Sequence, residues 1–410
     1  MSPLEPLVGG ALAERADGGF DGRTVGAPGP GPDFPVRPSA LTVSHPPRSH
    51  PAGVLNLKSC ELQHPEADRL VARALAGIDL REARSYPFQD AVSAALAERH
   101  GLPAGRILLT AGSDRAIGLL TDAFAVPAGR LLLPEPSFEA WRYYARLRGV
   151  PVTACPQVVG SPPRLDFGPL LAAVRTSPPA VVALTNPASP SGLLATEEEV
   201  LRLAEACDRY GHLLVIDECY GAFTGLTHLP LLSRFPRLVV VRSFSKSHAL
   251  AGARVAAVFA REEITTHLAG YRPDSTVSGP ALALLRQLLD QQEEFERVWA
   301  DVRAIRTRFA EAVERARPHW RRLDPGANFV TFQTGSRTAP IETAETLLRH
   351  GYRVRALTEV PGLAECLRIS LAGPAAMAEV AGIIAATAAS AARSRVAPAP
   401  SPHPARSRSW

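Results

Sequence analysis

The chain has 410 residues, of which 46% are hydrophobic and 21% charged, a composition typical of a folded globular protein. Its length allows two or three domains. The formal net charge is +5, but four arginines lie in the acid-free segment 392–410, and aromatic residues make up only 6% of the chain. No run of five or more lysines and arginines occurs, which argues against nucleic-acid binding through a basic stripe.

The cysteines give no sign of a disulfide framework or of a metal site. Their number is odd, they are scattered, and none form a C-x-x-C pair, as is typical of a reducing compartment. They are Cys60, Cys155, Cys207, Cys219 and Cys366. No basic segment followed by a long apolar core opens the chain, and the apolar segment 379–392 is too short and Ala-rich to span a bilayer. We therefore expect a cytoplasmic protein without metal or membrane contact, with a packed C-terminal helix.

The two ends of the chain differ in composition from the middle. Residues 1–50 are rich in Gly, Pro and Arg, and residues 394–410 have a similar composition. Such segments cannot bury enough apolar surface to offset the entropy lost on ordering. We therefore expect both to be disordered.

Short apolar runs alternate with helical stretches through the first part of the folded region. The runs predict buried parallel strands at 106–110, 130–134, 180–186, 212–217 and 238–243. Helical stretches separate most of them, such as 114–125 and 196–211, the second with a Thr cap followed by acids. This alternation predicts an α/β domain with a mostly parallel sheet, which we assign to residues 86–317.

The pattern changes after a long helical region at about 278–317. Apolar runs at 327–334, 352–357 and 366–372 predict strands with two helices around them. A smaller α+β domain at 318–393 is the expected result. We find no internal repeat.

Lysine is rare in this chain, so each lysine is a candidate for a specific chemical role. The sequence has 45 lysines and arginines, and only Lys58 and Lys246 are lysines. Arginine stays charged, whereas a desolvated lysine can lose its proton and attack a carbonyl carbon. Lys246 is therefore a candidate Schiff-base nucleophile, with a leftover surface lysine as the alternative.

The residues that follow the predicted strands matter because ligands of open parallel sheets bind at the carboxyl ends of the strands. Asp217 closes the strand 212–217, and burying a carboxylate there is costly without a partner. A pyridinium nitrogen would be such a partner, and a helix-capping role is the alternative.

Two further strand ends suit a phosphate group. Ser113 and Asp114 open a helix directly after the strand 106–110, and helix N-termini bind phosphate, although an ordinary cap would look the same. Ser243, Ser245 and Arg254 surround the candidate lysine with two hydroxyls and a guanidinium.

The segment around Ser243 also matches the S-x-x-K pattern of serine acylases. Those enzymes carry a K-T-G motif elsewhere, and both lysines of this chain are followed by serine. The acylase interpretation is therefore strongly disfavoured.

Eight motifs occur in a specific order between residues 53 and 393. They are R-x-Y-P, G-S-D, E-P-x-aromatic, N-P-x-x-P-x-G, D-E-x-Y, S-x-S-K-x-x-x-L-A-G-x-R, A-N-F and L-R-I. In this the chain resembles the class I/II aminotransferases that use pyridoxal 5'-phosphate (PLP), in particular the histidinol-phosphate aminotransferase branch. The resemblance implies an aspartate-aminotransferase-like PLP fold, whose small domain draws on both chain ends, here 51–85 and 318–393.

The resemblance implies roles for the residues at the cofactor. Lys246 would form the Schiff base with PLP and later move a proton. Asp217 would pair with the pyridine nitrogen, Tyr220 would hydrogen-bond the phenolic oxygen, and Phe138 would stack on the ring. The phosphate would be held by Ser113, Asp114, Ser243, Ser245 and Arg254.

The resemblance also implies a partner subunit and a small-molecule substrate. Tyr86 would reach the cofactor phosphate of the partner subunit, which implies a homodimer with a shared active site. Arg368 would bind the substrate carboxylate with Asn328 nearby, and Arg355 matches a position that contacts the substrate phosphate in the histidinol-phosphate branch. The expected reaction moves an amino group from an amino donor to a 2-oxo or carbonyl acceptor.

The chain departs from the family pattern at two places. Ser189 stands where the family has the asparagine that meets the phenolic oxygen, and the N-E-N-P substrate loop is replaced by residues 55–65, which include Lys58. These changes favour a specialised biosynthetic role. A decarboxylase or lyase of the threonine-phosphate decarboxylase type shares nearly all the motifs and stays open. A PLP-fold regulator would need a helix-turn-helix that residues 1–50 cannot supply.

Overall fold

The structure is a computed structural model of the chain, and it describes residues 51–396 apart from 274 and 324–325. The expected N-terminal segment 1–50 lies outside the described residues, as does the expected tail apart from its first three residues. Those three residues continue the last helix, α14 (Pro374–Val396).

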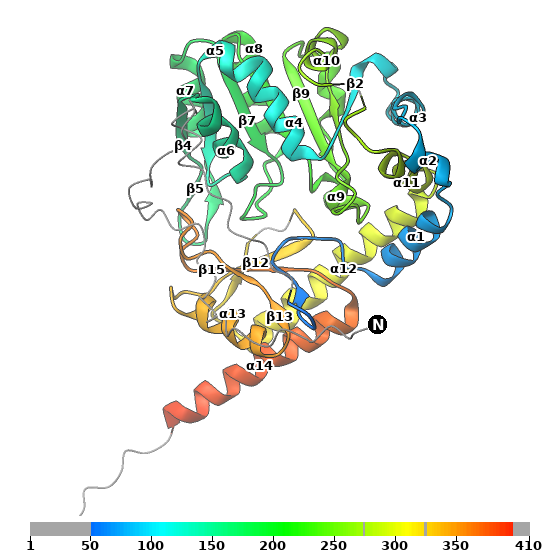
Figure 1. The fold of residues 1–410 in the computed structure, drawn as a ribbon. Helices are drawn as coiled ribbons and strands as arrows, with labels where there is room; N and C mark the ends of the chain where they lie inside the picture. Colours follow the sequence, from blue (N-terminus) through cyan, green and yellow to red (C-terminus); the bar gives the residue numbers. More distant parts are fainter. Residues whose placement is uncertain (1–50, 274, 324–325, 397–410) are drawn as a thin grey trace, which may run out of the picture.

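A seven-stranded sheet forms the centre of the larger part of the molecule (Figure 1). Its strand order is β2-β10-β9-β8-β7-β3-β4, and only β10 runs antiparallel to its neighbours. The strands are β2 (Ile107–Thr110), β3 (Leu131–Glu135), β4 (Val152–Pro156), β7 (Val181–Thr185), β8 (Leu213–Asp217), β9 (Leu238–Ser243) and β10 (Ala256–Phe259). This confirms the predicted α/β fold with a mostly parallel sheet.

Two of these strands are missing from the sequence prediction, each for a physical reason. β4 lies at the edge of the sheet, and most of its side chains are not buried, so it lacks a continuous apolar run. β10 is four residues long and half alanine, and it follows directly on the Lys246 segment. Neither length nor β-propensity marks such a strand in a sequence.

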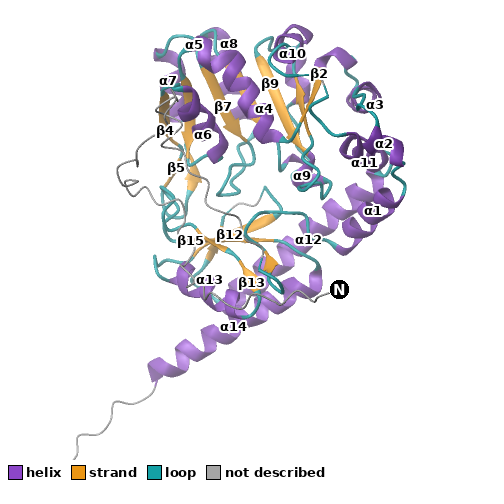
Figure 2. Ribbon diagram, in the orientation of Figure 1, coloured by secondary structure: helices purple, strands orange, loops and turns teal. Residues whose placement is uncertain are grey.

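Helices cover both faces of the large sheet (Figure 2). Alternate residues of each strand belong to two separate apolar clusters, as the two-residue period of a strand requires. In β8, for example, Leu214 and Ile216 belong to one cluster and Val215 to the other. The Val215 face is covered by α4 (Ser113–Leu120), α6 (Glu139–Arg148) and α10 (Glu262–Ala269). The opposite face is covered by α3 (Asp90–His100), α7 (Gly168–Thr176), α8 (Glu197–Arg209) and α11 (Gly279–Leu289).

The smaller part contains a four-stranded sheet of order β11-β12-β15-β14. Its strands are β11 (Arg321–Arg322), β12 (Phe329–Gln333), β14 (Arg355–Ala356) and β15 (Cys366–Ser370). Beside it, β1 (Leu55–Asn56) from the beginning of the described chain pairs in parallel with β13 (Tyr352–Arg353). Both ends of the described chain therefore build the smaller part, as the resemblance implies.

A 25-residue helix, α12 (Gln292–Ala316), connects the two parts (Figure 1). The predicted helical region 278–317 is therefore two helices, separated by Asp290 and Gln291. The other elements are α1 (Pro65–Ala76), α2 (Leu80–Arg84), η2 (Ala104–Arg106), the π-helix η3 (Thr121–Ala125), α5 (Val126–Ala128), β5 (Val158–Val159), β6 (Arg164–Leu165), η4 (Gly221–Phe223), η5 (Leu229–Ser233), α9 (Phe244–Ser247) and α13 (Ala339–Arg349). Within the described ranges, no helix combines the length and the apolar character needed to cross a membrane.

Candidate active site

The predicted cofactor residues lie at the carboxyl ends of neighbouring strands of the large sheet. Asp217 is the last residue of β8, and Lys246 lies in α9, directly after β9. Ser113 begins α4, three residues after Thr110 ends β2, and β10 separates β2 from β9. This edge of the sheet faces the smaller part of the molecule (Figure 1).

Asp217 is a buried acid without a cationic partner among the described residues. Its side chain is 1% exposed, and Oδ1 accepts a hydrogen bond from the Cys219 backbone N–H at 3.0 Å. Burial raises the pKa of Asp217 to about 7, against an ordinary value of 3.8. A protonated ring nitrogen would supply the missing positive charge and keep the carboxylate ionised.

Lys246 is half-buried and fixed by a backbone contact from the other part of the molecule. Its Nζ donates a hydrogen bond to the Ser59 carbonyl oxygen at 2.6 Å. Ser59 belongs to the segment 55–65, here called the substrate loop. The lysine is thus held at the junction between the large sheet and this loop.

The residues predicted to hold a phosphate surround Arg254. Its Nη2 donates to Asp114 Oδ2 at 2.8 Å, and its Nη1 donates to Ser245 Oγ at 3.5 Å. Gly112, with φ of 82°, precedes Ser113, and a Cβ atom at position 112 would lie 2.6 Å from Arg254 Nη2. Only glycine fits there, because both the backbone conformation and the closeness of the guanidinium exclude a side chain.

Ser243 and Phe138 have local roles in addition to the predicted ones. The Ser243 hydroxyl caps α9 by accepting a hydrogen bond from the Ser245 backbone N–H at 3.2 Å. Phe138 precedes the first turn of α6, and it is half-buried against the apolar cluster on that face of the sheet. Their contacts with a cofactor stay predictions.

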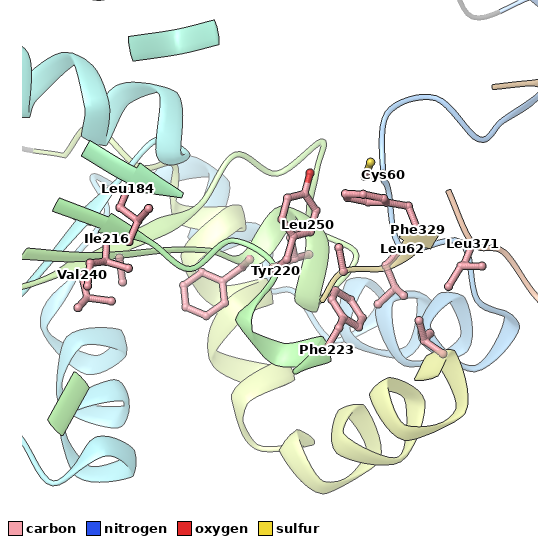
Figure 3. Packing of buried hydrophobic residues seen from close by; sticks show 14 of the residues in the cluster. Cys60, Leu62, Leu184, Ile216, Tyr220, Phe223, Val240, Leu250, Phe329 and Leu371 are labelled. Carbon is pink, nitrogen blue, oxygen red and sulfur yellow. The ribbon is translucent and has the colours of Figure 1, made fainter. Parts of the chain in front are cut away.

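Tyr220 lies where the large sheet meets the smaller part. It is buried, and its ring packs edge-on against Phe329, with ring centroids 5.3 Å apart and an interplanar angle of 88°. Figure 3 shows Tyr220 close to Cys60 and Phe329 at the border of the apolar cluster. Burial raises the pKa of the Tyr220 hydroxyl well above its ordinary value. The hydroxyl therefore stays protonated and can donate a hydrogen bond.

The N-P-x-x-P-x-G loop after β7 separates its two polar residues. Asn186 is buried, and its side chain bonds only the backbone of Ala195, with distances of 2.9 and 3.4 Å. The Asn186 amide is thus engaged by the loop's own backbone. Ser189 is half-buried three residues later, and its role stays a prediction.

The two candidate substrate arginines are direct neighbours in the small sheet. Arg355 of β14 stands opposite Arg368 of β15 in the strand register. The Arg368 guanidinium lies 5.0 Å from the centre of the Phe329 ring, and its buried Nε has no hydrogen-bond partner. Arg355 Nη2 lies 3.6 Å from Glu139 Oε1. Burial, together with the charge of Arg368, lowers the pKa of Arg355.

The substrate loop is held by three successive carbonyl groups, a feature that sequence reasoning missed. The carbonyl oxygen of Lys58 accepts from Arg368 Nη2 at 2.6 Å, and that of Ser59 accepts from Lys246. The carbonyl oxygen of Cys60 accepts from Asn328 Nδ2 at 3.0 Å. The loop therefore links Lys246 to Arg368 through its backbone. Backbone acceptors leave no signal in a residue pattern.

Comparison with known proteins identifies the family to which the chain belongs. The family described as "Aminotransferase class I and II" matches residues 52–382. A histidinol-phosphate aminotransferase of Symbiobacterium thermophilum is 32% identical over 310 residues, which cover 75% of this chain and 82% of that protein. The chain therefore belongs to the class I and II aminotransferases.

Solved structures show the same fold at lower identity. The histidinol-phosphate aminotransferase of Sinorhizobium meliloti, in complex with PLP, has a TM-score of 0.74 at 22% identity and covers 87% of this chain and 98% of its own. The L-threonine-O-3-phosphate decarboxylase of Porphyromonas gingivalis has a TM-score of 0.67 at 22% identity, covering 82% of this chain and 99% of its own. The fold is thus shared by both reaction types.

The protein is a PLP-dependent aminotransferase, and the residues present fit that cofactor. Among the described residues the buried Asp217 has no cationic partner, the Lys246 amine lies at the junction of the two parts, and Arg254 lies in a cluster of polar groups that could hold a phosphate. Among the described residues no cluster could hold a metal ion.

Proposed function

We propose that the protein transfers an amino group between an amino donor with an anionic group and a 2-oxo or carbonyl acceptor, in a biosynthetic pathway. The observation that carries this proposal is the meeting of Asp217, Lys246 and the Arg254 cluster at one edge of the sheet, opposite Arg355 and Arg368. When bound, PLP supplies an electron sink for the negative charge that develops at the substrate Cα.

Three residues of the large sheet perform the proposed chemistry. Lys246 would attach the cofactor through Nζ, and its freed amine would then take the proton from the substrate Cα and deliver it to the cofactor carbon to which the amino group becomes attached. Asp217, as a carboxylate, keeps a proton on the ring nitrogen. Tyr220 would donate a hydrogen bond to the phenolic oxygen, and the shorter hydroxyl side chain of Ser189 stands at the position of the family's second donor.

The cofactor phosphate is assigned to the cluster around Arg254. Ser113 and Asp114 begin α4, so backbone N–H groups of its first turn are available to a phosphate oxygen. Arg254 and the hydroxyl groups of Ser243 and Ser245 complete the proposed binding set. Charge-assisted hydrogen bonds of this kind are about twice as strong as neutral ones.

The small sheet binds the substrate in this proposal. Arg368 takes the carboxylate through a guanidinium that still has an unpartnered, buried Nε. Asn328 orients the substrate loop beside it. Arg355 takes a second anionic group, in line with the names of the relatives.

We further propose a cytoplasmic homodimer with shared active sites. Tyr86 is 86% exposed, and Leu80 and Phe88 close to it are also among the most exposed large side chains of the described chain. Exposed apolar groups so close together support a partner surface. Tyr86→Phe is expected to weaken PLP retention while leaving the dimer intact, which gel filtration and cofactor absorbance after dialysis measure. A fully active monomer would contradict the shared site.

The reaction type is tested by mixing holoenzyme with a panel of amino acids. Transamination converts the bound cofactor to pyridoxamine phosphate, with loss of the visible absorbance and formation of a 2-oxo acid. Decarboxylation releases carbon dioxide without pyridoxamine phosphate. The second result with an O-phosphorylated amino acid would replace the proposal by the decarboxylase alternative.

A further inference from the structure

An ion pair connects β8 and β9 at the edge of the large sheet. Glu218 follows Asp217, the last residue of β8, and Arg242 precedes Ser243, the last residue of β9. Arg242 Nε donates to Glu218 Oε2 at 2.9 Å, and the two side chains are 23% and 1% exposed. Asp217 pairs with Val241 in the strand register, and the Glu218 N–H donates to the Val241 carbonyl oxygen at 2.8 Å. The ion pair is therefore the next cross-strand contact after this register pair.

Four donors surround the Glu218 carboxylate. Oε1 accepts from the His228 backbone N–H at 2.5 Å and from His228 Nδ1 at 2.8 Å. Oε2 accepts from Arg242 and from the Thr227 hydroxyl at 3.3 Å. Burial alone would raise the pKa of Glu218, but the His228 hydrogen bonds and the Arg242 charge outweigh it and lower the pKa. Glu218 is therefore an ionised carboxylate inside the protein, and His228 Nδ1 carries the proton of the hydrogen bond.

Arg242 is held by groups from several other elements. Its Nη2 donates to the Thr227 hydroxyl, and its guanidinium lies 5.7 Å from the centre of the Phe259 ring of β10. Its Nη1 lies 3.3 Å from Nε2 of His100, which ends α3. Burial and the charge of Arg242 lower the pKa of His100 to about 4, so the ring is neutral and Nε2 can accept this hydrogen bond. The contacts therefore fix both the position and the orientation of the guanidinium.

The ion pair lies on the face of the sheet opposite to the side chain of Asp217. Successive side chains of a strand point to opposite faces. Ile216 belongs to the apolar cluster of one face and Val215 to that of the other. By this alternation, Glu218 shares the face of Ile216, and Asp217 shares the face of Val215. The pair therefore acts on the backbone that carries Asp217 and makes no contact with its carboxylate.

The two charges add a fixed geometry that apolar packing would not provide. A buried ion pair can often be replaced by apolar side chains of similar volume without loss of stability, because the charges lose their hydration on burial. Apolar burial is non-directional, however, whereas charge-assisted hydrogen bonds require defined distances and angles. A pair of this kind therefore suits a place where two strand ends must keep a fixed relative position.

We propose that the Glu218–Arg242 ion pair positions Asp217 and Lys246 for the reaction by fixing the ends of β8 and β9 to each other. Arg242 lies four residues before Lys246, so a shift of β9 moves the lysine relative to Asp217. Glu218 and Arg242 are positioning residues, and neither touches the cofactor or the substrate. This inference rests on the proposed function, which gives Asp217 and Lys246 their roles.

The test replaces the ion pair by two apolar side chains in the holoenzyme. Glu218→Met alone leaves the Arg242 charge without its partner and should lower the temperature of thermal unfolding. The double variant Glu218→Met/Arg242→Met should regain most of this loss. If the pair only stabilises the fold, the double variant is then a normal enzyme.

If the pair positions the site, the double variant keeps two defects. The visible circular dichroism per bound PLP, which reports how the site holds the ring, should fall by about half or more. The rate constant for conversion of the cofactor by the fastest amino acid of the panel above should fall about 10- to 100-fold, as expected for a misplacement of about 1 Å. The concentration of amino acid at half-maximal rate should stay unchanged, because the small sheet is intact.

Two further variants make the result specific. Glu218→Gln keeps the side-chain volume and removes the charge, so it should show the same two defects, and it decides the question if the double variant does not fold. Asp122→Leu/Arg148→Met is the matched control. Arg148 Nε donates to Asp122 Oδ1 at 2.5 Å in a partly buried ion pair. Arg148 ends α6 just before β4 begins, at the opposite edge of the sheet, so the control should leave dichroism and rate unchanged.

The outcomes separate this inference from the proposed function. Wild-type dichroism and rate in the folded double variant, or in Glu218→Gln, overturn the inference and leave the aminotransferase as proposed. Equal defects in the control overturn it too, because the loss of any ion pair would then have the same effect. The proposed function fails in a different way: borohydride reduction of the wild-type holoenzyme would find the cofactor on a residue other than Lys246, or no amino acid would convert it. In the second case the dichroism still tests the ion pair.

Discussion

The cofactor side and the substrate side of this active site are assembled in different ways. On the proposed cofactor side, Asp217 ends one strand of the large sheet and Lys246 follows the neighbouring strand, so the sheet itself brings the two residues to one edge. On the substrate side, Arg368 bonds a carbonyl 310 residues earlier in the chain, and Asn328 one that is 268 residues earlier. The large sheet therefore positions the proposed cofactor residues, whereas the proposed substrate site exists only after the two ends of the described chain have met.

The largest effect is expected when each of the two lysines is replaced in turn, because one lies on each side of the site. Lys246→Ala should lower turnover by at least about 10³-fold, because attachment of the cofactor and proton transfer are lost together. Borohydride reduction followed by mass mapping should find no modified lysine. Lys58→Ala is the control and should keep a reducible bond at Lys246. A reducible bond in Lys246→Ala would move the attachment point to Lys58, on the other side of the site.

The second test uses the pH dependence of the protein without its cofactor. Asp217 has a pKa of about 7 in the folded chain and an ordinary value of 3.8. The folded state therefore holds this proton more tightly than the unfolded state, so its contribution to stability is fully present below pH 3.8 and is lost as the pH rises through 7. Between pH 5 and 6 the stability should fall by about 1.4 kcal/mol more than in Asp217→Asn.

Urea unfolding of both apoproteins at these two pH values gives the difference in slope. The absolute stability of Asp217→Asn is not compared, since the amide has hydrogen-bonding needs of its own. Parallel slopes for the two proteins would mean that Asp217 does not carry the raised pKa. In that case the raised pKa of Asp217 could no longer be used as an argument that its carboxylate pairs with a protonated ring nitrogen.

On the substrate side, Asn328→Leu should release the middle of the loop. The Cys60 carbonyl then loses its donor, and an unsatisfied buried acceptor costs about 1–3 kcal/mol. We expect KM for the amino donor to rise about tenfold while cofactor absorbance is unchanged. Thr331→Val, a buried change in strand β12, which begins directly after Asn328, serves as the control. If Asn328→Leu also lost the cofactor, cofactor binding and substrate binding would depend on the same contacts, which contradicts the comparison.

The smallest expected effect is that of Ser189→Asn on the cofactor side. An amide reaches further than a hydroxyl, and a hydrogen bond to a charged group contributes about 1.5–3 kcal/mol. The pH at which the visible absorbance of the holoenzyme changes should therefore fall by about one unit. Titration curves that coincide would place residue 189 away from the cofactor.

The difference between the two sides also explains which features of the structure could be predicted from the sequence. The five apolar strands, the Thr196 cap and the residues after each strand follow from local patterns. β4 and β10 do not, because an edge strand and a four-residue alanine-rich strand are specified by their neighbours in the sheet. The carbonyl contacts of the substrate loop could not be predicted at all, since they depend on backbone atoms that every residue has.

The long-range contacts of the substrate loop also determine which part of the site can form first while the chain is being synthesised. A nascent chain that has emerged as far as β10 already contains all seven strands of the large sheet, together with Lys246 and Asp217. The loop, although synthesised much earlier, cannot dock until Asn328, Arg368 and Ser370 have followed. The proposed cofactor side is thus synthesised before the proposed substrate side can be completed, since the substrate loop waits for residues more than 260 positions later in the chain.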